Sequence, residues 1–123
     1  MTAPSRAVLL VLGVASCVGL LVSCAARRRS PPPVAPPVFE MNCASCHGEK
    51  GHGDGPAGRF LNPPPRDFSD AEWQASITDD RLRQTIRQGG AAMGLSPAMA
   101  SHPDLGPEDI EELIRYIRSL SDA

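Results

Sequence analysis

The apolar positions between residues 107 and 120 recur every three or four residues. This spacing places them on one face of an α-helix, which the sequence predicts to begin at Pro107. Glu108 and Asp109 follow the proline, and acidic side chains favour the first turn of a helix. The apolar face consists of Ile110, Leu113, Ile114, Ile117 and Leu120. We therefore expect an amphipathic helix near the end of the chain.

Helix signals recur upstream of this stripe. A first helix is predicted over residues 38–46, after two prolines, with Gly48 closing it. Ser69 resembles an N-cap for a short helix, and Thr78 for a longer one that ends at Gly89 and Gly90. An alternating strand pattern is not found. The sequence therefore predicts an all-α domain of three to four helices.

The first 37 residues have a different character. Arg6 precedes an apolar run over residues 7–22, which is typical of an export signal covering residues 1–23. Leu21-Val22-Ser23-Cys24 resembles the bacterial lipobox, in which the cysteine is lipidated, and the corresponding match at Cys17 is weaker. An uncleaved membrane helix over residues 7–26 and a freely soluble mature protein are the alternatives. Residues 24–37 are rich in arginine and proline and predict a semi-rigid linker.

Residues 38–123 remain as the predicted folded domain. All 14 acidic residues lie in it, together with eight of the 12 Lys and Arg residues, so its net charge is −6. This charge argues against a nucleic-acid partner. It suits either simple solubility or a partner protein with a basic docking face.

The candidate chemistry lies in the pentapeptide Cys43-Ala44-Ser45-Cys46-His47. A C-x-x-C-H motif is typical of covalent c-type haem attachment, with two thiols for the vinyl groups and an imidazole for the iron. A zinc site would need a second ligand pair that the sequence lacks. A thioredoxin-like redox pair would need a βαβ context, which is not found, and a disulfide at this spacing would constrain little.

The segment from Asn42 to Gly48, the glycine-rich loop over residues 51–56, the segment 63–68 and the final helix together resemble a class I cytochrome c. The resemblance covers essentially residues 38–120. It implies first and last helices that cross beside one covalent haem c, with Phe39 and Tyr116 in contact at the crossing. It also implies that a proline carbonyl, from Pro56 or residues 63–65, orients His47. Arg59, Arg66 and Trp73 are candidate partners of the haem propionates.

The resemblance implies a methionine as the second axial iron ligand, beside His47. Met99 lies eleven residues before Ile110, close to the family spacing. Met93 is the alternative, followed by His102 or an open site. His52 is expected to be a solvated loop residue. A His/Met-ligated iron favours electron transfer over the binding of small molecules.

These features lead to one functional hypothesis and two alternatives. We expect a monohaem electron carrier, not an enzyme, tethered by lipid at the periplasmic side of a bacterial membrane. Redox proteins would be its donor and acceptor. The alternatives are a haem enzyme or ligand sensor with a weak or open sixth iron site, and a fixed haem subunit of a respiratory complex.

Overall fold

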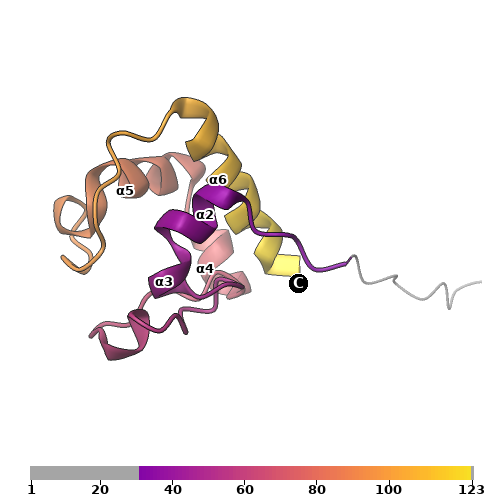
Figure 1. Ribbon diagram of the computed structural model, residues 1–123, viewed down its shortest axis with the longest axis horizontal. Coiled ribbons are helices and arrows are strands. Elements are labelled where there is room, and N and C mark those ends of the chain that lie inside the picture. Colours follow the sequence, from indigo (N-terminus) through magenta and orange to yellow (C-terminus); the bar gives the residue numbers. More distant parts are fainter. Residues whose placement is uncertain (1–30, 123) are drawn as a thin grey trace, which may run out of the picture.

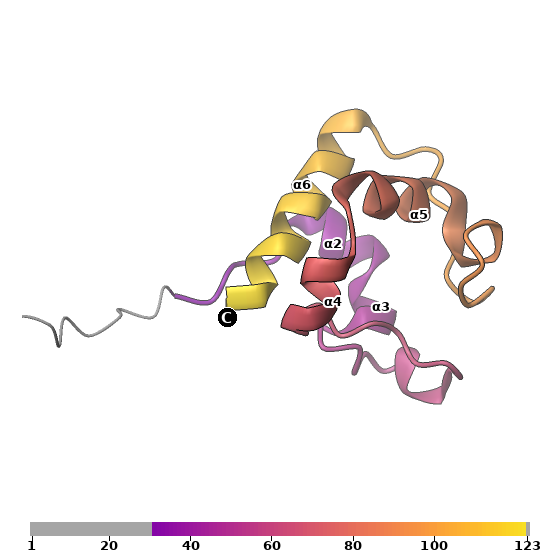
Figure 2. The ribbon, with the colours of Figure 1, turned by 180° about the vertical axis from the view of Figure 1, so that it is seen from behind.

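The computed structural model describes residues 31–122 of the 123-residue chain. The predicted signal peptide, the candidate lipidation site Cys24 and the alternative at Cys17 lie outside the described residues. Residues 31–36 precede the first helix and lie beside the end of the last one (Figures 1 and 2). Pro36 has φ −72° and ψ 152°, which are polyproline II angles.

The described part of the chain contains helices and no strand, which confirms the all-α prediction. The α-helices are α2 (Pro37–Asn42), α3 (Ala44–His47), α4 (Ala71–Ser76), α5 (Asp79–Ala92) and α6 (Pro107–Ser119). Two short 3₁₀ helices, η1 (Gly58–Phe60) and η2 (Leu120–Asp122), complete the list. The five α-helices within residues 31–122 exceed the expected three to four because the predicted first helix is broken at Cys43, where φ is −121°.

The helix ends follow the sequence signals with one correction. Thr78 caps α5 by accepting a hydrogen bond from the backbone N–H of Arg81, as predicted. The cap of α4, however, is Asp70, whose carboxylate accepts hydrogen bonds from the N–H groups of Glu72 and Trp73. Ser69, the predicted cap, lies one residue earlier, and its hydroxyl donates a 2.7 Å hydrogen bond to Asp67.

The glycine pair at the end of α5 is also placed as predicted. Gly89 has a φ of +78°, so the regular helix is interrupted there and one further turn follows to Ala92. A left-handed φ of this size favours glycine over any residue with a side chain. The interruption turns the chain toward the loop that carries Met99.

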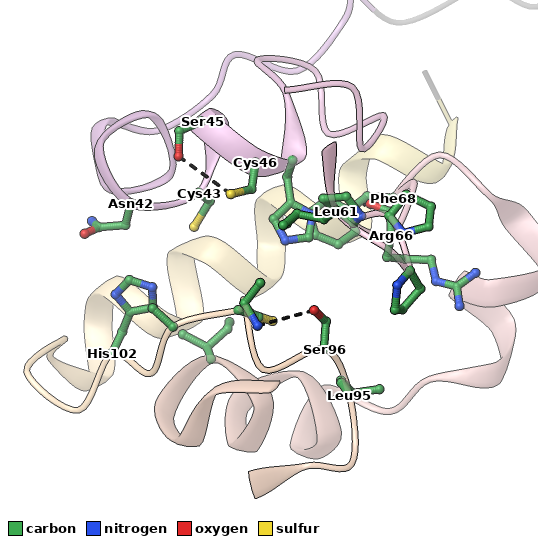
Figure 3. Close-up of a pocket in the computed structure, with 18 of the residues that line it drawn as sticks. Asn42, Cys43, Ser45, Cys46, Leu61, Arg66, Phe68, Leu95, Ser96 and His102 are labelled. Atoms are coloured by element: carbon green, nitrogen blue, oxygen red, sulfur yellow. Dashed lines mark hydrogen bonds between the residues drawn. The ribbon is translucent and has the colours of Figure 1, made fainter. Parts of the chain in front are cut away.

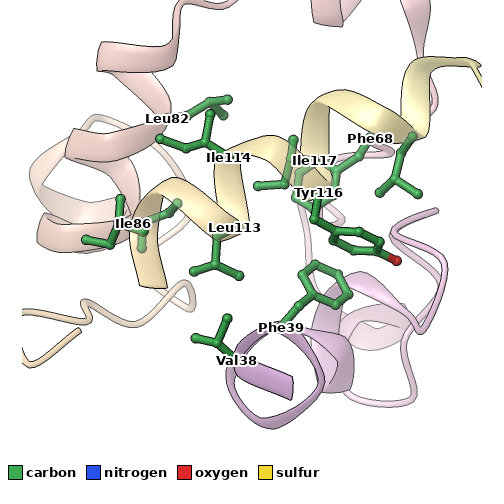
Figure 4. Close-up of a cluster of buried hydrophobic side chains, with 11 residues drawn as sticks. Val38, Phe39, Phe68, Leu82, Ile86, Leu113, Ile114, Tyr116 and Ile117 are labelled. Atoms are coloured by element: carbon green, nitrogen blue, oxygen red, sulfur yellow. The ribbon is translucent and has the colours of Figure 1, made fainter. Parts of the chain in front are cut away.

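The hydrophobic core lies where α6 contacts both α2 and α5 (Figure 4). All five residues of the predicted apolar stripe are buried, with at most 5% of each exposed. The rings of Phe39 and Tyr116 meet edge to face, with centroids 4.7 Å apart. The crossing of the first and last helices that the family resemblance implied is therefore present.

A buried polar network ties α4 to α6. The Gln74 side-chain amide donates 2.7 Å hydrogen bonds to the carbonyls of Phe68 and Ile117. Arg118 donates to the side-chain oxygen and the backbone carbonyl of Gln74, to the carbonyl of Ile77 and to Asp79. Because every polar atom of Gln74 is paired, its burial carries no unsatisfied group.

Candidate haem site

A cavity of about 620 Å³ opens between α3, the segment over residues 61–68, the loop after α5 and one face of α6 (Figure 3). The size lies within the ~300–1,000 Å³ usual for cofactor and ligand sites. Its wall is largely apolar and includes Phe39, Leu113, Ile117 and a run of three prolines, Pro63 to Pro65. The two ends of the described chain lie beside the end of α6, away from α3 and α5 (Figure 1).

Cys43, Cys46 and His47 all line this cavity. The break at Cys43 separates α2 from α3, and His47 is the last residue of α3. Both cysteines are half-buried and form no disulfide. Burial, with a smaller contribution from the neighbouring Cys46, raises the pKa of Cys43 to about 11. The Cys43 thiol is therefore protonated at neutral pH.

Two glycines allow the next loop to lie directly against α3. A Cβ on Gly55 would come within 2.5 Å of the Ser45 carbonyl oxygen, and one on Gly58 would collide with that of Cys46. The backbone N–H of Gly55 donates a 3.2 Å hydrogen bond to the Cys46 carbonyl. This packing fixes the short helix that presents the thiols and the imidazole.

The ring of His47 is oriented from one side by a backbone carbonyl. Its Nδ1 lies 3.3 Å from the carbonyl oxygen of Arg66. The family resemblance implied a proline carbonyl as this acceptor, and that expectation is wrong. The acceptor is the carbonyl of Arg66, the residue after Pro65, whereas Pro63 to Pro65 line the cavity. A hydrogen bond donated by Nδ1 selects the tautomer whose Nε2 carries the lone pair for a metal. Burial lowers the pKa of His47, against the opposing effect of the Arg66 hydrogen bond, and so favours this neutral form.

Two candidates for the sixth iron ligand share the cavity with His47. Met99 and His102 both line it, on the loop between α5 and α6. Met93 does not line it. Met93 is buried in the turn after α5, where the guanidinium of Arg81 donates a 2.7 Å hydrogen bond to its carbonyl and lies 4.0 Å from its sulfur. Met99 and His102 thus share one cavity with His47, and Met93 lies outside it.

Of the other residues singled out in the sequence, some line the cavity and some do not. His52 lies outside the cavity, with about half its side chain exposed and its Nδ1 3.4 Å from Asp67, as expected of a loop residue. Of the three candidate propionate partners only Arg66 lines the cavity. Arg59 lies near the exposed ring of Phe60, and Trp73 lies behind the cavity wall.

The glycine pair near the end of α5 has a role that the helix-end prediction missed. The N–H of Gly90 donates a 3.0 Å hydrogen bond to the Met99 carbonyl, and the N–H of Leu95 donates one of 2.8 Å to the Gly90 carbonyl. A Cβ on Gly90 would collide with the Ser96 carbonyl oxygen and come 3.1 Å from the Met99 Cβ. The signal was present in the sequence as two adjacent glycines, but only the fold shows what approaches them.

These residues fit a covalently bound haem. Two thiols on one turn, an imidazole with its Nδ1 already paired and a thioether on the facing loop are the donor types of a c-type site. The apolar wall suits a flat apolar ring, and Arg66 offers a positive charge for a carboxylate at the rim.

Comparison with known proteins agrees with this fit. Residues 36–121 match the family model described as cytochrome c. The chain is 34% identical over 86 residues to the cbb3-type cytochrome c oxidase subunit CcoP of Rubrivivax gelatinosus, covering 70% of this chain and 25% of that protein. It is 32% identical over 83 residues to the cbb3-type oxidase subunit FixP of Azorhizobium caulinodans, covering 68% and 25%.

A third relative is also named as an oxidase subunit. Cytochrome c oxidase subunit 2 of Alkalihalophilus pseudofirmus is 34% identical over 91 residues, covering 68% of this chain and 24% of the relative. The chain thus spans about a quarter of the length of these curated relatives. No solved structure matches it.

Proposed function

Because the chain belongs to the cytochrome c family, we propose that it carries single electrons on one covalently bound haem c. The observation that carries this proposal is that Cys43, Cys46, His47 and Met99 line one cavity. When bound, the haem supplies an iron that exchanges one electron with a partner. The chain's own residues attach the group, hold its ligands and keep water from its faces.

Each residue has a distinct part in this proposal. Cys43 and Cys46 would provide the two thioether attachments, and His47 would provide Nε2 as one iron ligand. Met99 would provide its thioether sulfur as the second iron ligand, which favours a filled coordination sphere and a raised potential. The apolar wall excludes water, and low solvent access is one of the properties that sets the potential of such a site.

A spectrum of the purified protein tests the proposal. We expect the oxidised form to show the weak far-red charge-transfer band of sulfur-ligated iron, and the reduced form to remain inert toward carbon monoxide. Fast carbon monoxide binding without that band would favour the enzyme or sensor alternative instead. Absence of covalent haem in mass spectra would overturn the function itself.

The tether belongs to the same proposal. Lipidation at Cys24 and the linker over residues 24–37 would hold the domain at the periplasmic face of a membrane. No helix within residues 31–122 is long and apolar enough to cross a membrane. Mass spectrometry of the mature protein is expected to show acyl chains on an N-terminal Cys24, and a Cys24→Ser variant is expected to lose them. An intact N-terminus that starts at Met1 would favour the uncleaved anchor.

The partners are proposed to be a redox donor and acceptor, at least one with a basic docking face. The domain's net charge of −6 supports this, yet the cavity wall contains no acidic residue. Acidic residues outside the wall, such as Glu108 and Glu112 on the exposed side of α6, would therefore attract the basic face of the partner. The apolar rim of the cavity would then make the close contact with the partner. A bimolecular electron-transfer rate that falls as salt is added is the expected result.

The relatives favour a second candidate, a haem subunit fixed in a respiratory complex. All three are named as oxidase subunits, although this chain matches only about a quarter of each. Extraction of membranes with a mild detergent, followed by affinity purification of this protein, distinguishes a fixed subunit from a free carrier. A fixed subunit is expected to bring large membrane subunits with it in fixed ratio, whereas a carrier is expected to elute alone.

A further inference from the structure

The imidazole of His47 lies face to face with the ring of Phe68. Their centroids are 4.5 Å apart and their planes differ by 16°. The Arg66 carbonyl, two residues earlier on the same segment, is the partner of His47 Nδ1. One hydrogen bond fixes a point of the ring but leaves the ring free to tilt about that point. A flat surface parallel to the ring removes this tilt.

Phe68 is itself held firmly. Its N–H donates a 2.7 Å hydrogen bond to the Gly51 carbonyl, and its carbonyl accepts a 2.7 Å bond from the side chain of Gln74. Only 7% of Phe68 is exposed. A Cβ on Gly51 would come 3.0 Å from the Phe68 ring, so the surroundings of the ring leave little room for movement.

A second ring supports Phe68 from outside the cavity. Trp73 stacks on Phe68 with centroids 5.5 Å apart and planes 28° apart, and the Arg66 guanidinium lies 5.8 Å from the Trp73 ring. Phe68 and His47 line the cavity, but Trp73 does not. The stack thus runs outward from the cavity wall, in the order His47, Phe68, Trp73.

We propose that Phe68 is a positioning residue that sets the plane of the His47 imidazole, and that Trp73 supports it. This inference rests on the proposed haem function, since the plane of an axial ligand affects an iron site only when iron is bound there. Groups around a ligand tune a metal site by fixing the orientation of that ligand. The stack therefore acts on the iron through His47 without touching it.

Phe68→Leu tests the proposal, because it removes the flat face and keeps an apolar side chain. We expect it to retain covalent haem but to shift the largest g value in the electron paramagnetic resonance spectrum of the oxidised protein, and to broaden that signal. Phe68→Tyr keeps the ring and is expected to restore the wild-type g values. Leu82→Ala, a buried core change outside the cavity, is expected to lower thermal stability and leave the g values unchanged.

Two results would overturn the proposal: wild-type g values in Phe68→Leu, or an equal shift in Leu82→Ala. If Phe68→Leu does not accumulate, Trp73→Leu decides, because Trp73 is only half-buried. A shift of the largest g value in Trp73→Leu would support the stack, and unchanged g values would contradict it. Absence of covalent haem from the wild-type protein would instead contradict the proposed function, so the two failures are distinguishable.

Discussion

The carbonyl of Met99 accepts a 3.0 Å hydrogen bond from the N–H of Gly90, two residues before the end of α5. This bond, together with the close approach of Ser96 to the same glycine, holds the loop that brings Met99 to the cavity. The position of the proposed ligand is thus set by a backbone contact that leaves no room for a side chain.

Gly90→Ala is therefore expected to disturb the site without changing any proposed ligand. The new methyl group would collide with the Ser96 carbonyl and press on the Met99 Cβ. We expect the far-red band of the oxidised protein to weaken and the reduced protein to begin to bind carbon monoxide. Gly106→Ala is the control, because its Cβ would meet nothing closer than 3.6 Å, and it should keep the wild-type spectrum.

The two methionines after α5 give a matched pair of variants. Leucine is close in volume to methionine but has no sulfur, so the change in packing alone is expected to cost less than about 1.5 kcal/mol of stability in each variant. Met99→Leu should abolish the far-red band and lower the reduction potential, whereas Met93→Leu should preserve both. Loss of the band in Met93→Leu with its retention in Met99→Leu would reverse the assignment. Retention of the band in both variants would exclude either methionine as the ligand.

What the sequence predicted correctly was local in character. The apolar stripe of α6 and the start of that helix at Pro107 depend on residues within a few positions of one another, and both are confirmed. The grouping of Cys43, Cys46 and His47 on one turn is local in the same sense. Periodicity and spacing suffice for such features.

What the sequence could not predict depends on approach between distant segments. The Arg66 carbonyl reaches His47 across 19 positions, and any carbonyl between residues 56 and 66 has the same chemistry. Phe68 carries no sign in the sequence that it will stack on an imidazole. Likewise, Ser69 and Asp70 are equally good caps by type, and only the folded backbone shows that the N–H groups of Glu72 and Trp73 bond to the Asp70 carboxylate.

Two phenylalanines with opposite exposure test where the stability lies. Phe39 is fully buried against Tyr116, whereas 82% of Phe60 is exposed. Phe39→Ala is expected to lower the free energy of unfolding by about 3–5 kcal/mol, as for other large core truncations. Phe60→Ala should change it by less than about 1 kcal/mol, since it loses only an exposed contact with Arg59. Urea unfolding followed by circular dichroism measures both, and similar losses would mean that α2 does not contribute to the core as described.

The carboxylate of Asp67 is expected to make stability depend on pH. Burial would raise the pKa of Asp67, but hydrogen bonds from the hydroxyl and N–H of Ser69, together with His52, outweigh it and leave the pKa below its ordinary 3.8. A pKa lowered by folding means that ionised Asp67 stabilises the native state above the unfolded pKa. That contribution is lost as the pH falls through the folded pKa.

Asp67→Asn should therefore be less stable than the wild type at about pH 6, by no more than about 1 kcal/mol because the carboxylate is half exposed. The difference should shrink as the pH falls to about 3. Asp104→Asn removes the same charge from an exposed site that makes no hydrogen bond through its side chain within residues 31–122. Its effect should be smaller and nearly constant over the same range. Urea unfolding of the three proteins at several pH values measures this, and a difference for Asp67→Asn that grows toward low pH would contradict the sign.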